Sequence, residues 1–143
     1  VNFSKKQIKN LIKLSNSLIN KYKIKKSCVL GHSDVAPDRK LDPGEKFPWK
    51  FLSKNRIGIW HNLNKKKLKP LRSKIILVKE NIFFMKNLKK FGYNFKSIRT
   101  KKNSKYNKLL IKAFQRRFRP ELINSKIDQE CLLIANKLAN IKV

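Results

Sequence analysis

Residues 31–49 read GHSDVAPDRKLDPGEKFPW and differ in composition from the rest of the 143-residue chain. The chain holds 37 Lys and Arg residues but only 8 Asp and Glu residues, and four of these acids lie in this one stretch: Asp34, Asp38, Asp42 and Glu45. His32, one of two histidines, stands beside them. Turn-forming segments attract some Asp in any protein. Carboxylates concentrated beside a histidine in such a basic chain nevertheless predict a cation site.

Zinc is the metal that suits these side chains. An imidazole nitrogen from His32 and a carboxylate oxygen from Asp42 are both ordinary zinc ligands. Lys40 lies two residues before Asp42 and would point to the same side in extended backbone, where an ammonium can stabilise a developing oxyanion. Alternatively, Lys40 is one more lysine among many. A catalytic zinc normally has three protein ligands, and the only other histidine is His61, so the residues alone predict an incomplete site.

The segments around this loop predict a layered α/β fold. Residues 4–22 have apolar side chains at helical spacing, and Ser4 with Gln7 fits a capping box. The apolar run Ser27–Leu30 reads as a buried strand, and a helix that leads into a strand is typical of an α/β layer. Prolines and Gly44 favour a loop over residues 31–48. Residues 49–55 are expected to form a short helix.

Downstream, the pattern becomes helical throughout. Residues 61–74 are polar, basic and interrupted by Pro70, which predicts a linker between domains; a charged surface loop within one domain is the alternative. Apolar spacing then predicts helices over 75–91, 104–117 and 128–139. Three such helices make a bundle near the lower size limit for an independent core. The expected domains are therefore 1–60 and 75–143, joined by 61–74.

The net charge of +29 is a second strong feature. A field of this sign attracts polyanions and is common in nucleic-acid-binding proteins. However, 30 of the 37 basic residues are Lys, whereas readers of nucleic acid favour the planar fork of Arg. The many Lys, Asn and Ile residues indicate a bias toward A/T-rich codons, which weighs against nucleic acid as the partner.

The cysteines and the apolar pattern add three further observations, although no compartment follows from the cysteine count. Cys28 and Cys131 belong to no CxxC pair, and we expect two small buried thiols, although a disulfide between them stays open. No apolar run is long enough to span a bilayer. The first residues do not have the pattern of a signal peptide.

The motifs HSD, AP, RK, DPG and FPW, in this order and spacing, resemble the signature of the zinc-dependent N-acetylmuramoyl-L-alanine amidases, which include anhydromuropeptide amidases and phage lysozyme-type amidases. The resemblance covers residues 1–60. The runs FGY at 91–93 and AFQRRFRPE at 113–121 resemble the peptidoglycan-binding module of some of these enzymes. The implied fold is the C-terminal part of a mixed-sheet amidase domain, followed by a small three-helix bundle.

The resemblance also implies roles for individual residues. His32 and Asp42 match two of the Zn²⁺ ligands, and Lys40 matches the lysine that polarises the scissile carbonyl and stabilises the tetrahedral intermediate. Arg39 and Trp49 match signature positions near the substrate. The family's first zinc ligand, a histidine, and its general base, a glutamate, fall upstream of the matching segment.

These observations predict a peptidoglycan hydrolase, a fragment of the full enzyme, that cleaves the amide between N-acetylmuramic acid and L-alanine in cell-wall turnover or recycling. Its partner would be peptidoglycan or muropeptides. Two alternatives stay open. One is an inactive or split amidase remnant that binds the wall or a complementary N-terminal fragment, and the other is a basic nucleic-acid-associated protein. The cell envelope or periplasm is the expected location, with the cytoplasm as the alternative for a recycling enzyme.

Overall fold

The computed structural model describes residues 2–96 and 100–141, and these residues form helices joined by loops. In chain order the elements are α1 (Lys5–Tyr22), η1 (Lys26–Cys28), α2 (His32–Val35), α3 (Trp49–Lys54), α4 (Lys65–Leu68), η2 (Lys69–Leu71), α5 (Val78–Phe91), α6 (Lys101–Phe118) and α7 (Gln129–Ala139). No strand occurs in the described ranges. The prediction of an α/β fold with part of a mixed sheet is therefore wrong for this chain.

The predicted strand over Ser27–Leu30 fails for a physical reason. The run begins inside the 3₁₀ turn η1, and only the residues after this turn are extended, with Val29 at φ −90° and ψ 103° and Gly31 at φ −88° and ψ 160°. An extended segment becomes a strand only when a neighbouring strand accepts and donates its backbone hydrogen bonds. The described part of the chain provides no such neighbour.

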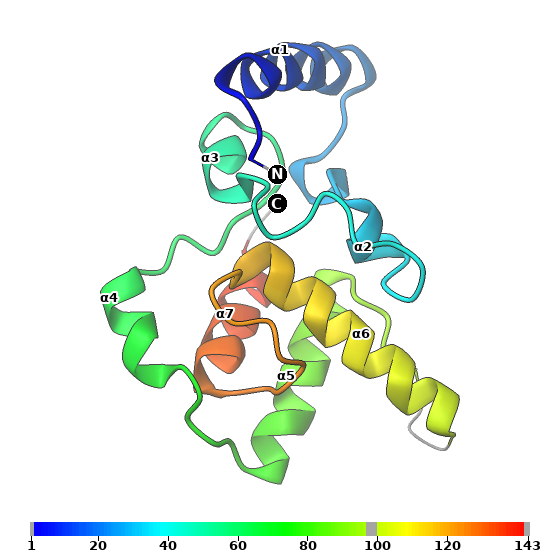
Figure 1. Ribbon diagram of the computed structural model, residues 1–143, viewed down its shortest axis with the longest axis vertical. Helices are drawn as coiled ribbons and strands as arrows, with labels where there is room; N and C mark the ends of the chain where they lie inside the picture. The colour runs from blue at the N-terminus through cyan, green and yellow to red at the C-terminus, as the bar shows by residue number, and fades with distance from the viewer. Residues whose placement is uncertain (1, 97–99, 142–143) are drawn as a thin grey trace.

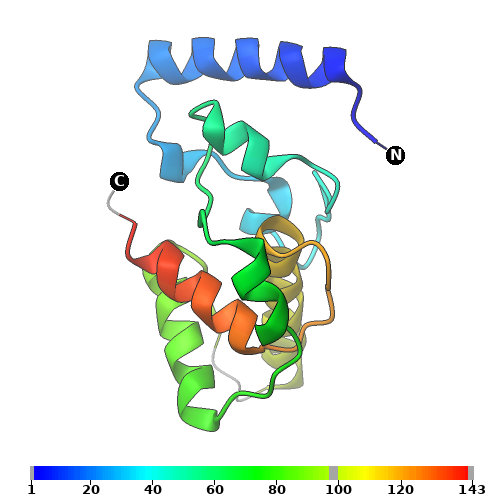
Figure 2. The same cartoon turned by 90° about the vertical axis from the view of Figure 1, so that its left-hand side faces the viewer.

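Helix α1 forms as predicted and contacts the edge of the core through four partly buried apolar side chains, Ile8, Leu11, Ile12 and Ile19. Ser4 and Gln7 make a reciprocal capping box at its start. Figures 1 and 2 show α1 across one end of the molecule, beyond α3 and away from α5, α6 and α7. None of its residues is fully buried. On its expected inner face, Leu18 and Tyr22 are exposed.

The helices α5, α6 and α7 occupy the three places where the sequence predicts helices. Their apolar side chains meet around three almost fully buried residues, Phe84, Phe114 and Ile134. Helix α5 begins later than predicted, and Ile75 and Leu77 precede it and are exposed. Glu80 caps the start of the helix at Leu77, because its carboxylate accepts a hydrogen bond from the backbone N–H of Leu77.

Residues 61–74 are folded against this core. Asn64 caps the short helix α4, and Leu68 of that helix is buried. The main hydrophobic cluster includes Trp49, Leu52 and Trp60 as well as residues of α5, α6 and α7. The division into 1–60, 61–74 and 75–143 stays a prediction. What the structure adds is that α3 and the chain after it supply core side chains for the bundle.

Both cysteines are free: Cys131 is buried, as expected, whereas Cys28 is exposed. Among the described helices, none combines the length and the apolar character that crossing a bilayer requires.

Candidate metal and substrate site

The loop at 31–49 is held in shape by backbone hydrogen bonds. The short helix α2 forms within it, and the N–H of Ala36 donates to the carbonyl of His32 (2.8 Å). The N–H of Lys40 then donates to the carbonyl of Ala36 (2.9 Å), which turns the chain back. Finally, the N–H of Ser33 donates to the carbonyl of Asp42 (3.0 Å). Ten residues of sequence are thereby folded so that His32 and Asp42 adjoin.

The side chains of His32 and Asp42 contact each other directly. His32 Nδ1 is hydrogen-bonded to Asp42 Oδ2, and the two side chains are 73% and 56% exposed. The hydrogen bond with His32 is the main cause that lowers the pKa of Asp42, and the charge of Lys40 adds a smaller effect in the same direction. The loop therefore presents a nitrogen and an anionic oxygen together at the surface, with a lysine near them.

The remaining predicted site residues lie at different depths. Arg39 and Lys40 are exposed on the same loop. Trp49, at the start of α3, is only 5% exposed and lies against the guanidinium of Arg117, 4.0 Å from ring centroid to Cζ. The ring of Phe47 packs edge-on against Trp49 at 4.9 Å between centroids.

Asp34 belongs to the acidic stretch, yet its carboxylate is used inside the fold. Its side chain is 4% exposed and pairs with Arg117, with 2.5 Å from Nη1 to Oδ2. It also accepts hydrogen bonds from the hydroxyl of Tyr93 (2.6 Å) and from the backbone N–H of Gly31 (2.9 Å). The concentration of acids beside His32 thus has two causes, a structural one for Asp34 and the contact with His32 for Asp42.

His61 takes no part in this site. Its Nε2 donates to the carbonyl of Phe118 (3.3 Å), and its Nδ1 accepts from the N–H of Leu63 (3.0 Å). Burial lowers its pKa to about 4, so the ring is neutral and both nitrogens are occupied. Among residues 2–96 and 100–141, no three His, Cys, Asp or Glu side chains gather in a group suited to a metal ion.

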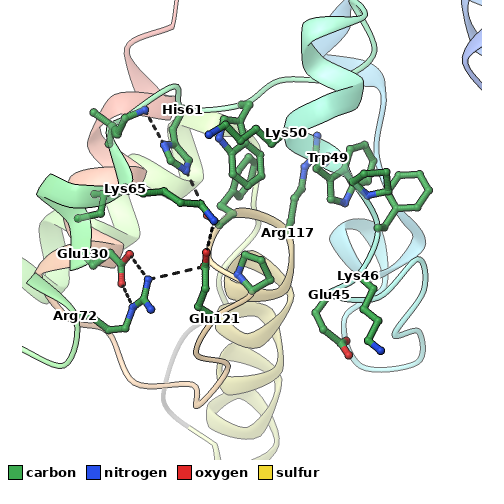
Figure 3. A pocket seen from close by; sticks show the side chains of 17 residues that line it. Glu45, Lys46, Trp49, Lys50, His61, Lys65, Arg72, Arg117, Glu121 and Glu130 are labelled. Carbon is green, nitrogen blue, oxygen red and sulfur yellow. Dashed lines mark hydrogen bonds and ion pairs between the residues drawn. The ribbon is translucent and has the colours of Figure 1, made fainter. Parts of the chain in front are cut away.

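A cavity of about 250 Å³, lined in part by Trp49, lies between residues 45–50 and the end of α6 (Figure 3). Trp49, Trp60 and Phe118 give it aromatic walls. Two ion pairs lie among its lining residues, Lys65 with Glu121 (2.7 Å) and Arg72 with Glu130 (2.7 Å). His32, Lys40 and Asp42 do not line this cavity.

The sequence alone assigns no role to three side chains that the structure places in buried polar contacts. Arg117 and Arg119 stand in a basic run that could equally have faced glycan, nucleic acid or solvent, and Tyr93 reads as a core aromatic. In the structure Arg117 and Tyr93 hold Asp34, whereas Arg119 pairs with Asp128 (2.8 Å). The sequence offered one signal for the two arginines. Arginine is rare in this lysine-rich chain, and a buried ion pair favours its planar guanidinium over an ammonium.

Comparison with known proteins shows what this chain is similar to. The family model described as N-acetylmuramoyl-L-alanine amidase matches residues 1–45. The chain is 34% identical over 136 residues to the N-acetylmuramoyl-L-alanine amidase AmiD of Escherichia coli K12, an alignment that covers 95% of this chain and 48% of AmiD. Along nearly its whole length, the chain is therefore similar to an N-acetylmuramoyl-L-alanine amidase.

Two solved structures share the fold of this chain. An AmiD complex with the substrate anhydro-N-acetylmuramic acid-L-Ala-D-γ-Glu-L-Lys superposes with a TM-score of 0.77 at 34% identity, covering 96% of this chain and 52% of that one. AmpDh3 of Pseudomonas aeruginosa gives a TM-score of 0.76 at 28% identity, covering 96% and 54%. The 1,6-anhydro-N-acetylmuramyl-L-alanine amidase AmpD of Haemophilus influenzae is 42% identical over 53 residues, which is 36% of this chain and 29% of AmpD. The chain spans about half the length of AmiD, although the alignment with AmiD covers 95% of this chain.

Proposed function

We propose that this chain forms part of a zinc-dependent N-acetylmuramoyl-L-alanine amidase, which hydrolyses the amide between N-acetylmuramic acid and L-alanine in muropeptides or peptidoglycan. The observation that carries the proposal is the contact between His32 Nδ1 and Asp42 Oδ2 on an exposed loop. This loop lies almost wholly within the segment that the amidase family model matches. AmiD, similar along nearly the whole chain, is bound to a muropeptide substrate in its solved complex.

The donor set fits zinc. One imidazole nitrogen and one carboxylate oxygen adjoin at the surface, and both are ligands that zinc accepts. His32 and Asp42 would hold the ion, and bound zinc would lower the pKa of a water molecule and polarise the substrate carbonyl. The described residues offer no third ligand beside them. The family resemblance assigns that ligand, a histidine, and the glutamate general base to sequence that precedes the matching segment.

Other residues of the loop would act on the substrate. We assign to Lys40 the stabilisation of the oxyanion that develops at the scissile carbonyl, because its ammonium is exposed and near Asp42. Arg39 is exposed and suited to a peptide carboxylate. Trp49 would meet substrate only through the cavity that it lines (Figure 3).

The test is an amidase assay on this chain joined to the protein sequence encoded directly upstream in its reading frame. With zinc bound, the protein should release a peptide that begins with L-alanine from an anhydromuropeptide. His32→Ala and Asp42→Ala should abolish zinc binding and release. Lys40→Met should lower kcat about 10²- to 10³-fold with zinc content unchanged, whereas Lys13→Met, at an exposed position of α1, should have little effect. A zinc-loaded protein that releases no such peptide would exclude the amidase.

A wall-binding remnant without catalysis is the second candidate, and the two-ligand site favours it. Such a protein, alone or with a separately encoded N-terminal fragment, would pellet with purified peptidoglycan but not cleave it. The net charge of +29 is the observation that favours the other alternative, a nucleic-acid-binding function. That function predicts an affinity that falls steeply with salt, because binding would release counterions from the phosphates. A cell-envelope location belongs to the wall-directed proposals, and a cytoplasmic one would suit a recycling amidase.

A further inference from the structure

A buried carboxylate joins the metal-ligand loop to the helical bundle. Asp34 belongs to α2, the same short helix as His32, and its side chain is 4% exposed. Its partners come from two distant places: Arg117 of α6, eighty-three residues away, and Tyr93, just after α5. Burial and the neighbouring Asp34 carboxylate raise the pKa of Tyr93 well above its usual value, so its hydroxyl stays protonated and donates.

Asp34 in turn determines where α2 begins. One of its oxygens accepts the backbone N–H of Gly31 at 2.9 Å, the residue directly before His32. Ser33, directly after His32, is buried, and its backbone N–H donates a hydrogen bond to the carbonyl of Asp42. The side chains of His32 and Asp42 are largely exposed and have little packing of their own. The backbone that carries them is therefore held in place mainly through the buried carboxylate of Asp34.

The planar guanidinium of Arg117 makes three contacts around Asp34 at once. One guanidinium nitrogen, Nη1, pairs with Asp34, and the other, Nη2, donates to the carbonyl of Val29 at 3.2 Å. The plane of the group also stacks on Trp49, 4.0 Å from the ring centroid. A lysine ammonium can neutralise a carboxylate, but it has no planar fork to make both bonds and stack at once.

From these contacts we infer that Arg117 is a positioning residue for the zinc ligands, and that it acts through Asp34 on the backbone of His32 and Asp42. The inference rests on the proposed zinc function and deepens it, because it makes the order of the metal site depend on the helical bundle. Groups that orient metal ligands from behind typically change metal affinity 10- to 100-fold when they are replaced.

Arg119 offers a matched control. It lies two residues beyond Arg117, is 1% exposed, and pairs with a buried carboxylate, that of Asp128. Both arginines therefore support the fold through a buried ion pair, but only Arg117 contacts the segment that carries His32. Loss of either is expected to lower stability, and loss of Arg117 alone is expected to weaken zinc binding.

The experiment measures Zn²⁺ affinity by competition with a chromogenic chelator, on folded protein at a temperature below every melting transition. Arg117→Lys should bind zinc about 10- to 100-fold more weakly than the wild type, and Arg119→Lys should bind it equally well. Tyr93→Phe, which removes one hydrogen bond to Asp34, should give a smaller loss. Equal affinity in Arg117→Lys and Arg119→Lys would overturn the inference. If His32→Ala binds zinc as well as the wild type, the proposed zinc site itself is wrong.

A second measurement needs no metal. Hydrogen exchange of the Ser33 and Ala36 amides, whose acceptors are the carbonyls of Asp42 and His32, reports directly on the order of the loop. In Arg117→Lys these amides should exchange at least tenfold faster than global unfolding allows. In Arg119→Lys their exchange should follow global stability alone. Exchange governed by global unfolding in both variants would also overturn the inference.

Discussion

Gly31 lies so close to Pro43 that a Cβ atom on the glycine would be 2.6 Å from Pro43 Cδ. The same Cβ would lie 3.3 Å from Cζ2 of Trp49. Gly31 directly precedes His32, and Pro43 directly follows Asp42. The absent side chain therefore lets the two ligand-bearing segments approach each other, in addition to the backbone bond from Ser33 to Asp42.

We predict that Gly31→Ala destabilises the protein by about 1–3 kcal/mol, the usual cost of forcing extra carbon into a packed site. Urea unfolding of wild type and variant measures this change. The matched control measures the same substitution in a Pro43→Ala background, which lacks the atom that clashes, and the loss caused by Gly31→Ala should be smaller there. If the two substitutions lower the unfolding free energy additively, the close approach is not what requires glycine here.

Glu130 and Glu121 allow a comparison between a buried and a partly exposed carboxylate near the same arginine. Glu130, 2% exposed at its side chain, accepts two hydrogen bonds from Arg72 and lies 3.7 Å from Arg119. Glu121, 34% exposed, pairs with Lys65 on the rim of the cavity in Figure 3. Glu130→Gln should cost about 1.5–3 kcal/mol, because the buried carboxylate loses its charge-assisted hydrogen bonds with Arg72.

Glu121→Gln should cost less than about 1 kcal/mol, as is usual for solvent-screened pairs. Thermal or denaturant unfolding of both variants under the same conditions measures the two values. Similar losses would mean that burial does not control the strength of these ion pairs.

How much of this molecule is predictable from sequence depends on the range of the interaction. Local signals gave the helices: the Ser4 and Gln7 capping box is present, and α5, α6 and α7 lie where apolar spacing predicts them. The expected strand at Ser27–Leu30 is wrong because strand formation requires a partner segment, which no local pattern reveals.

The candidate site divides in the same way. His32 and Asp42 were singled out from residue type and motif, and the fold brings them into contact. The roles of Asp34 and Arg117 could not be predicted, because their pairing joins positions eighty-three residues apart. By local sequence alone, Asp34 is one acid of a turn-rich segment and Arg117 is one base of a basic run. In a chain with 37 basic residues, composition alone does not distinguish the buried arginines from the exposed ones.

The two cysteines give a direct probe of the fold. Cys28 is exposed, whereas Cys131 is fully buried and burial raises the pKa of its thiol to about 12. Only a thiolate reacts with disulfide reagents. We therefore expect one thiol per folded chain to react rapidly with Ellman's reagent near neutral pH, and two after denaturation. Cys28→Ser should remove the fast reaction, whereas two fast thiols in the native protein would contradict the buried position of Cys131.

His61 makes the stability of the protein depend on pH. Its imidazole is 3% exposed, and burial lowers its pKa from 6.5 to about 4. Above pH 6.5 the ring is neutral in both the folded and the unfolded chain, so it adds no pH dependence. Between pH 6.5 and 4 the unfolded chain takes up a proton that the folded chain refuses, and the folded state loses stability as the pH falls.

By linkage, this one group should lower the unfolding free energy by about 2 kcal/mol between pH 7 and pH 5. Urea unfolding at several pH values, compared with the same series for His61→Gln, isolates its effect. Carboxylates with lowered pKa, such as Glu121, also lose stability in acid, but they are present in both proteins. The glutamine amide can still donate to the Phe118 carbonyl and does not titrate. The variant should therefore show a flatter dependence on pH, and parallel curves would mean that His61 is not buried as a neutral ring.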